Sequence, residues 1–302
     1  MRSWVVSITP FDAAGALDED AFRRHLRRIA SAGAGAYVGS SNVGEGFTLT
    51  DDERDRIFTI AAEELKGKTP IRAAGCEPRG LRDIGAYLDA AARAGLDAAH
   101  IFQLDNGHTG KPGVAEMEAF YTRAIERAEL PVVISSYPSM GYVVPLDLIA
   151  KLLDRFPRIV ALRAGGGDLA WLAEAIRRFR GRVEVYSAGI PAIPPSILLG
   201  ADGFLSGEGN LVPGLTARLC AAADANDLKA VQRAYRSLLA LSNVLARFGA
   251  SSGRGIKPLL DRLGLPGGTI RPPRLAIEGA TLDALAEAVR ELGLEELQKT
   301  GG

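Results

Sequence analysis

One order of segments repeats along most of the chain and limits the folds that the chain can adopt. From residue 4 to about residue 210, a short apolar stretch is followed by a Gly/Ser/Asn/Pro loop, an amphipathic helical pattern and a short turn. Alternating strands and helices predict a parallel sheet with right-handed crossovers. Eight stretches are predicted as strands, enough to close the sheet into a (β/α)8 TIM barrel of the α/β class: residues 4–8, 35–39, 70–75, 97–102, 131–135, 158–163, 182–187 and 201–206.

The helical patterns and the first turn support the barrel. Phe22, Leu26 and Ile29 recur at helical spacing between the first two strands. The alternative is an open doubly wound sheet, but the first strand ends in Thr9-Pro10-Phe11 and lacks a Gly-x-Gly-x-x-Gly turn. After the eighth strand only helical patterns follow. We therefore predict a barrel over residues 1–212 and a C-terminal helical appendage over residues 213–302 that packs on it.

Composition narrows the class of protein. The chain has 302 residues, of which 47% are hydrophobic, and its 36 Lys+Arg balance its 36 Asp+Glu. This balance gives no electrostatic reason to bind nucleic acid or an anionic membrane. The two cysteines, Cys76 and Cys220, fit a reducing compartment, and the chain begins without the pattern of a signal peptide. We expect a cytoplasmic protein with no membrane segment.

The residues that follow each strand define the functional face of such a barrel. After the second strand, the hydroxyls of Ser40 and Ser41 can converge with backbone N–H groups on a carboxylate or phosphate. The alternative is a tight turn in which Glu45 is a structural hydrogen-bond partner. The third strand ends at Cys76 and Glu77.

The histidines offer little evidence for a metal. His108 and Asp105 could be ligands, but no second histidine lies nearby, so a solvated loop is expected and no metal site is predicted. His100 alternates with apolar neighbours and is predicted to be a satisfied core residue. His25 lies among arginines on a helix and is predicted to be solvated. Cys76 is expected to pack rather than to act as a nucleophile.

With these strand ends in place, the chain resembles the dihydrodipicolinate synthase / N-acetylneuraminate lyase family of class I aldolase-type barrels over about residues 4–275. The resemblance rests on Thr9-Pro10-Phe11, Gly39-Ser40-Ser41 with Gly44-Glu45, Pro131 with Pro138-Ser139, residues 200–206 with Asn210, and Ile256-Lys257-Pro258. It implies a small 2-oxo acid or sugar acid as ligand, no cofactor, and a homodimer or homotetramer. Substrate binding is assigned to Ser40, Ser41, Gly44, Glu45, Leu205 and Lys111.

Two positions depart from what the resemblance implies. The family has a lysine at the end of strand six that forms a Schiff base, and Arg163 stands there instead. A guanidinium stays protonated to about pH 12 and cannot attack a carbonyl carbon. The family's proton-relaying tyrosine at the end of strand five maps onto Ser135, although Tyr137, two residues on, would return to the same face. Met140 stands at the position of the arginine that binds an acidic co-substrate, so dihydrodipicolinate synthesis is not expected.

Several functional hypotheses remain open. In the first, Arg163 clamps a substrate carboxylate while Glu208 and Tyr137 act as acid and base in an enolisation, dehydration or retro-aldol step. Arg163 and Glu208 could instead be paired with each other. In another, Lys111 in the loop after strand four replaces the missing amine. In the last, the protein binds a carboxylate or sugar acid without turnover, as a pseudoenzyme or sensor.

Overall fold

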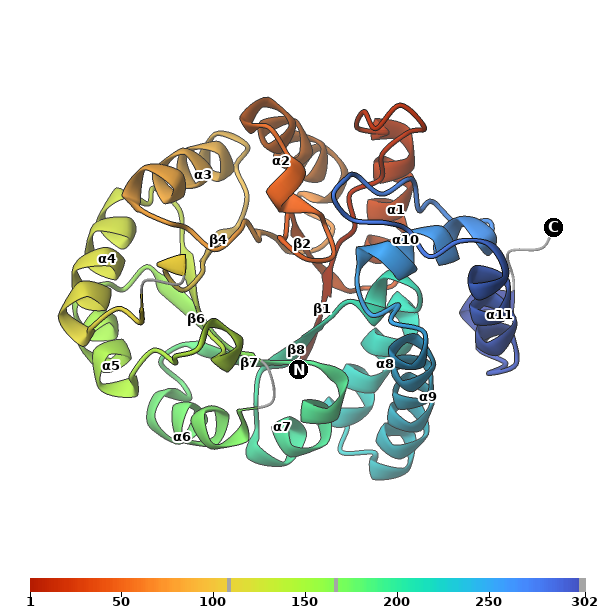
Figure 1. Cartoon of the computed structure of the whole chain (residues 1–302). Helices are drawn as coiled ribbons and strands as arrows, with labels where there is room; N and C mark the ends of the chain where they lie inside the picture. Colours follow the sequence, from red (N-terminus) through yellow and green to blue (C-terminus); the bar gives the residue numbers. More distant parts are fainter. Residues whose placement is uncertain (108–109, 166–167, 299–302) are drawn as a thin grey trace.

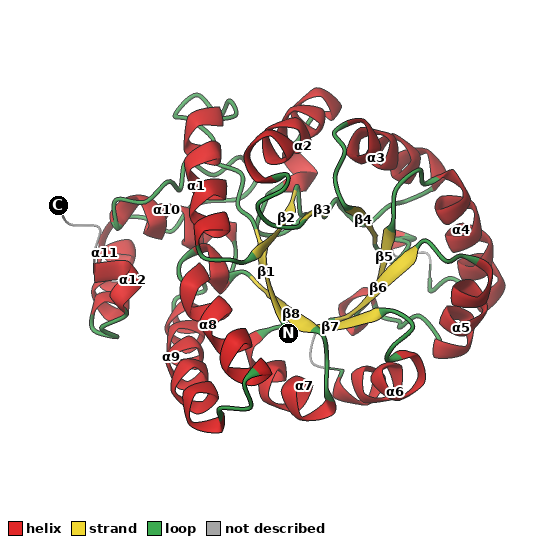
Figure 2. Ribbon diagram, turned by 180° about the vertical axis from the view of Figure 1, so that it is seen from behind, coloured by secondary structure: helices red, strands yellow, loops and turns green. Residues whose placement is uncertain are grey.

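The computed structural model describes residues 1–107, 110–165 and 168–298. In these ranges eight parallel strands close into a barrel in chain order, with helices around it (Figures 1 and 2). The predicted TIM barrel is confirmed, and each strand lies within two residues of its predicted bounds. The strands are β1 (Arg2–Val6), β2 (Gly35–Val38), β3 (Ile71–Ala73), β4 (Ala98–Ile101), β5 (Val132–Ser136), β6 (Ile159–Ala164), β7 (Glu184–Ala188) and β8 (Gly203–Ser206).

A ring of helices surrounds the barrel, and further helices follow it. The ring consists of α1 (Glu19–Ser31), α2 (Asp51–Leu65), α3 (Leu81–Arg93), α4 (Val114–Arg127), α5 (Leu146–Arg155), α6 (Leu169–Phe179), α7 (Ile193–Leu199) and α8 (Pro213–Asp224). The C-terminal part is α9 (Leu228–Arg247), α10 (Gly253–Arg262), α11 (Gly279–Arg290) and α12 (Glu295–Gln298). Short 3-10 helices are η1 (Gly46–Thr48), η3 (Pro138–Met140), η4 (Ile190–Ala192) and η5 (Glu208–Asn210). None of the helices in the described ranges is both long and apolar enough to cross a bilayer.

Side-chain alternation along each strand separates two cores. Val132 and Ile134 of β5 point outward into the core under the helices, whereas Val133 points into the barrel. Inside the barrel, Trp4 packs edge-on against Tyr37 and Tyr186, with ring centroids 5.0 and 5.9 Å apart. These aromatic side chains fill the barrel interior toward the N-terminal ends of the strands.

The side chain of Trp4 packs so closely that its neighbour in the sheet must be small. This packing also fills the N-terminal end of the barrel. Gly35 lies beside Trp4 in the sheet, and a Cβ atom there would come within 2.5 Å of the indole. The guanidinium carbon of Arg72 lies 4.3 Å from the Trp4 ring centroid, and Arg72 forms a 2.7 Å ion pair with Glu184 at the start of β7. The N-terminal end of the barrel is therefore filled, and free space remains at the C-terminal ends of the strands.

The C-terminal helices gather on one side of the barrel, beside α1 and α8 (Figure 1). Their apolar side chains share one hydrophobic cluster with barrel residues such as Phe204 of β8 and Val43 after β2. The cluster includes Leu241 of α9 and Ile256 of α10. The described C-terminal part thus packs on the barrel, while the domain boundary at residue 212 stays a prediction.

The prediction of a solvated His25 is wrong. His25 is fully buried in α1 on the same face as Phe22, Leu26 and Ile29, and its Nε2 atom lies 2.8 Å from Asn210 Oδ1. Burial, and then the nearby charge of Arg28, lowers its pKa to about 3. The surrounding arginines suggested an exposed face, but position 25 lies three residues after Phe22 and therefore turns inward.

Candidate active site

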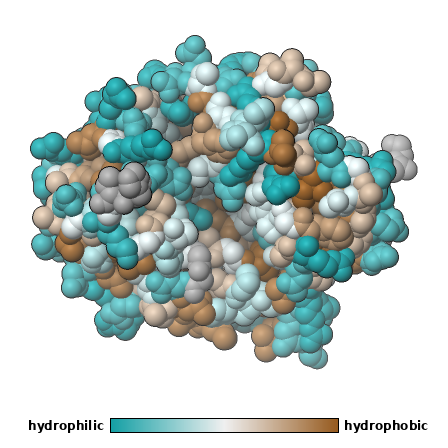
Figure 3. Space-filling model, viewed as in Figure 1, coloured by the Kyte–Doolittle hydropathy of each residue, from teal (hydrophilic) through white to brown (hydrophobic). Residues whose placement is uncertain are grey.

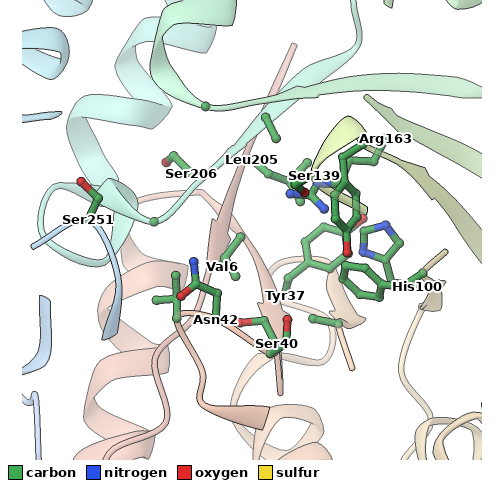
Figure 4. A pocket seen from close by; sticks show the side chains of 18 of the residues that line it. Val6, Tyr37, Ser40, Asn42, His100, Ser139, Arg163, Leu205, Ser206 and Ser251 are labelled. Atoms are coloured by element: carbon green, nitrogen blue, oxygen red, sulfur yellow. The ribbon is translucent and has the colours of Figure 1, made fainter. Parts of the chain in front are cut away.

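A cavity of about 440 Å³ opens at the C-terminal ends of the strands, where the face drawn in Figure 3 is hollowed. Every strand or the segment directly after it contributes to the lining. Arg163, His100 and Tyr37 lie on one side of the cavity, and Asn42, Ser206 and Ser251 lie on the other, with Val6 between them (Figure 4). The first end of the cavity is therefore cationic and aromatic, and the labelled side chains at the other end are polar.

Arg163 places a cation at the first of these ends. The residue pairs with Ser135 across β5 and β6, and its Nη1 donates to Ser135 Oγ at 3.3 Å. Among the described residues, its buried Nε finds no hydrogen-bond partner and no carboxylate forms a salt bridge with it. Burial lowers the pKa of this guanidinium, opposed by Tyr137, Tyr37 and Glu77. An arginine normally stays charged, so this cation lacks a counterion in hydrogen-bond contact.

The alternative pairing of Arg163 with Glu208 does not form. Glu208 also lines the cavity, but its carboxylate accepts a 2.8 Å hydrogen bond from Ser242 on α9. Ser135, the position that corresponds to the family's tyrosine, is fully buried, is not among the described residues that line the cavity, and accepts a hydrogen bond from Arg163.

Tyr137 reaches the cavity from the end of β5, as the two-residue period of a strand requires. Its backbone N–H donates to Gln103 Oε1 at 2.6 Å, and its hydroxyl donates a short hydrogen bond to Glu77 Oε1. The guanidinium carbon of Arg163 lies 5.4 Å from its ring centroid. Burial raises the pKa of Tyr137, and the carboxylate of Glu77 raises it further, so the phenol is a proton donor in this arrangement.

Glu77 is the site residue to which the sequence analysis gave no role. It lines the cavity from the loop after β3, and Ser41 Oγ approaches its Oε1 at 3.5 Å. The available signal was its position directly after a barrel strand. That signal applies equally to Cys76, whose thiol has its pKa raised to about 11, mainly by burial. A thiol with such a pKa is a poor nucleophile, in keeping with the expectation that Cys76 packs.

The loop after β2 lies at the cavity wall but satisfies many of its own polar groups. Ser40 and Ser41 both line the cavity. Ser40 Oγ accepts a hydrogen bond from Gly44 N at 3.0 Å, and Ser41 N donates to Gly75 O at 3.1 Å. These N–H groups are thus engaged within the protein. The hydroxyls of the two serines are the groups that the loop offers to a ligand.

Glu45 is buried away from the cavity in a structural ion pair. Its Oε1 lies 2.5 Å from Lys257 Nζ of α10, and its Oε2 accepts a 2.9 Å hydrogen bond from Arg271 N. Both charged side chains of the pair are fully buried. These contacts favour the structural alternative for Glu45 over a ligand contact.

The remaining predicted residues fall into three places. Leu205 lines the cavity from β8, whereas Lys111 is exposed in the loop before α4 and is not part of the lining. His108 lies outside the described residues. Among the described residues that line the cavity there is no lysine. No group of three or more His, Cys, Asp or Glu side chains in the described ranges is arranged to hold a metal ion.

His100 differs from its prediction as a satisfied core residue. It is buried, with its ring 4.4 Å from that of Phe102 and 5.4 Å from that of Tyr37, but it also lines the cavity and its Nε2 has no partner. Burial lowers its pKa far below the usual value, and the charges of Arg163 and Arg72 lower it further. The imidazole is therefore neutral, and its buried Nε2 has no hydrogen-bond partner among the described residues.

Comparison with known families agrees with this architecture. The model of the family described as "Dihydrodipicolinate synthetase family" matches residues 1–292. The chain belongs to this family. Among curated members, it is 28% identical to 4-hydroxy-tetrahydrodipicolinate synthase of Pseudomonas aeruginosa over 97% of this chain and 98% of that protein. It is also 28% identical to 4-hydroxy-tetrahydrodipicolinate synthase 1 of Streptomyces coelicolor, over 97% and 94% of the two chains.

Solved structures of the dihydrodipicolinate synthetase family share the fold. The dihydrodipicolinate synthase of Aquifex aeolicus aligns with a TM-score of 0.88 at 22% identity, covering 97% of this chain and 98% of that one. The enzyme of Acinetobacter baumannii, described as complexed with pyruvate, aligns with a TM-score of 0.85 at 24% identity, covering 97% and 98%. At these identities the likeness concerns the fold alone.

Proposed function

We propose that this member of the dihydrodipicolinate synthetase family is a carbon-carbon or carbon-oxygen lyase for a small 2-oxo acid or sugar acid, without a Schiff base. The observation that carries the proposal is the guanidinium of Arg163, which faces the cavity without a carboxylate partner. A charge removed from water without a partner is costly, and a ligand carboxylate would relieve that cost through charge-assisted hydrogen bonds. The hydroxyls of Ser40 and Ser41 are proposed to hold a further polar group of the ligand.

The absence of Schiff-base chemistry follows from the residue types at the site. The resemblance implies a lysine at the end of the sixth strand, and in this chain the residue there is Arg163 on β6. Within the described lining of the cavity no primary amine is present, and Lys111 lies exposed outside it. We therefore propose that the protein is not a dihydrodipicolinate synthase. The pyruvate complex of the Acinetobacter baumannii relative makes pyruvate a reasonable first probe.

We call the proposed binding of a ligand carboxylate by Arg163 the carboxylate clamp. This clamp is tested by ligand binding to the wild-type protein and to two arginine variants. Pyruvate and 2-oxobutanoate at about ten times their Kd are expected to stabilise the protein by about 1.4 kcal/mol, a rise in Tm of about 2–4 °C. Arg163→Met is expected to abolish the shift. Arg82→Met is the matched control, because Arg82 is 97% exposed and should leave the shift unchanged. Absence of a shift for every 2-oxo acid and sugar acid tried would contradict the proposal.

A trapping experiment separates the clamp from covalent catalysis. Pyruvate with borohydride is expected to leave the intact mass of the wild-type protein unchanged, since no lysine reaches the ligand. A trapped adduct would point to Lys111 or another lysine and would overturn the non-covalent mechanism. In Arg163→Lys, gain of an adduct is expected if the cavity retains the shape of an aldolase site.

A non-catalytic role is the alternative, and two contacts favour it. The hydroxyl of Tyr137 is held by Glu77, and the carboxylate of Glu208 is held by Ser242, so both predicted acid/base groups are engaged. A sensor or pseudoenzyme would bind the carboxylate without turnover. Binding together with the absence of any conversion or proton exchange of the ligand would identify it.

We also propose a cytoplasmic homodimer or homotetramer. One solved relative, 22% identical, is described as the first monomeric dihydrodipicolinate synthase variant, which suggests that monomers are not the usual form in the family. Light scattering after size exclusion should give a mass of two or four times 31.9 kDa.

A further inference from the structure

Glu77 carries an inference that rests on the proposed carboxylate clamp and goes beyond it. We propose that Glu77 is the general base that removes a proton from the carbon next to the carbonyl of a 2-oxo acid bound at Arg163. Neither the family resemblance nor the predicted pair of Glu208 and Tyr137 assigns it this role. This role is supported by the place of Glu77 across the cavity from Arg163, by its second carboxylate oxygen, which has no hydrogen-bond partner among the described residues, and by the positions of the other nearby carboxylates.

Glu77 and Arg163 approach one cavity from different sides of the barrel. Glu77 follows β3 and Arg163 lies near the end of β6, and these strands are not neighbours in the closed sheet. Tyr137 lies between them, because its hydroxyl contacts Glu77 while its ring centroid is 5.4 Å from the guanidinium carbon of Arg163. One aromatic ring thus separates the base from the cation. In a small 2-oxo acid the carboxylate carbon and the acidic carbon are both bonded to the carbonyl carbon, so they lie on its two sides, and such a molecule is of comparable size.

The hydrogen bonds of Glu77 orient it and leave one oxygen available. Its Oε1 accepts from the hydroxyl of Tyr137 and, at 3.5 Å, from Ser41 Oγ. Its Oε2 accepts no hydrogen bond from any residue in the ranges 1–107, 110–165 and 168–298. Arg54, a cation on the far side of Glu77, directs its Nη1 to Asp51 at 2.7 Å. A carboxylate held at one oxygen and open at the other is suited to accept a proton.

Position separates Glu77 from the other carboxylates near the cavity. Glu208 is held at one oxygen by Ser242, as Glu77 is by Tyr137, but Ser206, two residues before Glu208 in the sequence, lies at the opposite end of the cavity from Arg163 (Figure 4). Glu45 is buried in the ion pair with Lys257 and is not part of the lining. Glu77 is therefore the carboxylate of the described lining that lies beside the cationic end.

The proton transfer balances without any further reagent. Glu77 Oε2 takes the proton from the carbon adjacent to the carbonyl, so a C–H bond breaks and a carboxyl O–H bond forms. The electron pair of the C–H bond becomes the C=C bond of an enolate, and the π pair of the carbonyl moves onto its oxygen. The guanidinium of Arg163 stabilises this negative charge electrostatically. Return of the proton from Glu77 restores the oxo acid, and in D₂O the returning particle is a deuteron.

Deuterium exchange into pyruvate tests the assignment without knowledge of the natural substrate. The methyl signal of pyruvate is followed by proton NMR in D₂O with wild-type protein, Glu77→Gln, Glu208→Gln and Glu118→Gln. Glutamine keeps an acceptor for the Tyr137 hydroxyl but cannot take up the proton, so Glu77→Gln is expected to lower the exchange rate at least about 100-fold. Glu118 is a surface residue of α4 paired with Lys151, and its variant should match the wild-type protein.

Binding measured in parallel distinguishes the possible failures. Glu77→Gln is expected to retain the thermal shift by pyruvate, which shows that it folds and that the clamp is intact. Exchange at the wild-type rate in that variant, or loss of exchange in Glu208→Gln alone, would overturn the assignment while leaving the clamp standing. Binding by the wild-type protein without any exchange would also overturn it. If none of the 2-oxo acids and sugar acids tried binds the wild-type protein, the proposed function itself is contradicted.

Discussion

Arg163 and His100 both lie at the cationic and aromatic end of the cavity, and of these two side chains only Arg163 carries a charge. His100 is neutral because burial and the positive charges of Arg163 and Arg72 lower its pKa far below the usual value. A second positive charge beside Arg163 would be repelled, so the neutral state fits a site built around one guanidinium. The Nε2 of His100 is buried and has no hydrogen-bond partner among the described residues.

His25 provides the clearest pH prediction at the scale of single residues. Its pKa is lowered to about 3 in the folded protein, from a usual value of 6.5. Between these values the unfolded chain binds a proton that the folded protein does not. The contribution of neutral His25 to the free energy of unfolding is therefore fully present above about pH 6.5. It is lost as the pH falls toward 3, by up to about 1.4 kcal/mol per pH unit. Urea unfolding of the wild-type protein between pH 7 and pH 4 should show this loss.

A glutamine at this position removes the titration. His25→Gln is expected to be destabilised at pH 7, since the contact with Asn210 Oδ1 is perturbed, but its stability should fall less steeply toward pH 4. His100 shifts in the same direction and will leave part of the slope. Equal slopes for the variant and the wild-type protein would show that His25 does not titrate as its burial requires.

At the scale of elements, one ion pair ties the loop after β2 to α10. Glu45 and Lys257 are separated by 212 positions in sequence, yet both side chains are fully buried and lie 2.5 Å apart. Lys257 Nζ also lies 4.3 Å from the ring centroid of Phe11. Burial lowers the pKa of Lys257 to about 8, although Glu45 opposes the shift. The pair positions the segment that carries Ser40 and Ser41 against the C-terminal part of the chain.

Removal of one partner should be costly because the other remains as a buried charge. Lys257→Met is expected to lower the free energy of unfolding by about 3–5 kcal/mol at pH 7, measured by urea unfolding. The double variant Glu45→Gln/Lys257→Met should lose less than Lys257→Met alone, since no unpaired charge is left. If the double variant loses the sum of the two single losses, the pair is not energetically coupled.

Elements with a clear period were predictable from the sequence, and contacts between distant elements were not. Eight apolar stretches and their spacing predicted the barrel, and the two-residue period predicted that Tyr137 would face the cavity. Nothing local to Lys257 indicated that its ammonium would be buried against Glu45. From the sequence, Glu77 could be recognised only as a residue after a strand. Its orientation in the site depends on a hydrogen bond from Tyr137, which lies 60 positions away. Likewise, the arginines next to His25 in the sequence suggested an exposed helix face, although its side chain points into the core.

At the scale of the whole molecule, the barrel and the C-terminal helices share one interior. Phe204 and Val43 from the barrel side are buried in the same hydrophobic cluster as Leu241 of α9, Ile256 of α10 and Leu285 of α11. Separation of the two parts would expose this cluster to water at a cost of about 1.5–3 kcal/mol for each large side chain. The helical part therefore cannot unfold without also removing part of the barrel's core.

We accordingly predict that the described helical part and the barrel unfold in one transition. Both tryptophans, Trp4 in the barrel interior and Trp171 on α6, report only on the barrel, whereas far-UV circular dichroism reports on every helix. Urea unfolding curves from fluorescence and from circular dichroism should coincide, as they do for one cooperative unit. A chain ending at Asp227 serves as the control, since it lacks α9 to α12 and should fail to give a cooperative transition. A separate ellipticity change before the fluorescence transition would instead indicate an independent C-terminal domain, and the ion pair of Glu45 with Lys257 would then have to break without disturbing the barrel.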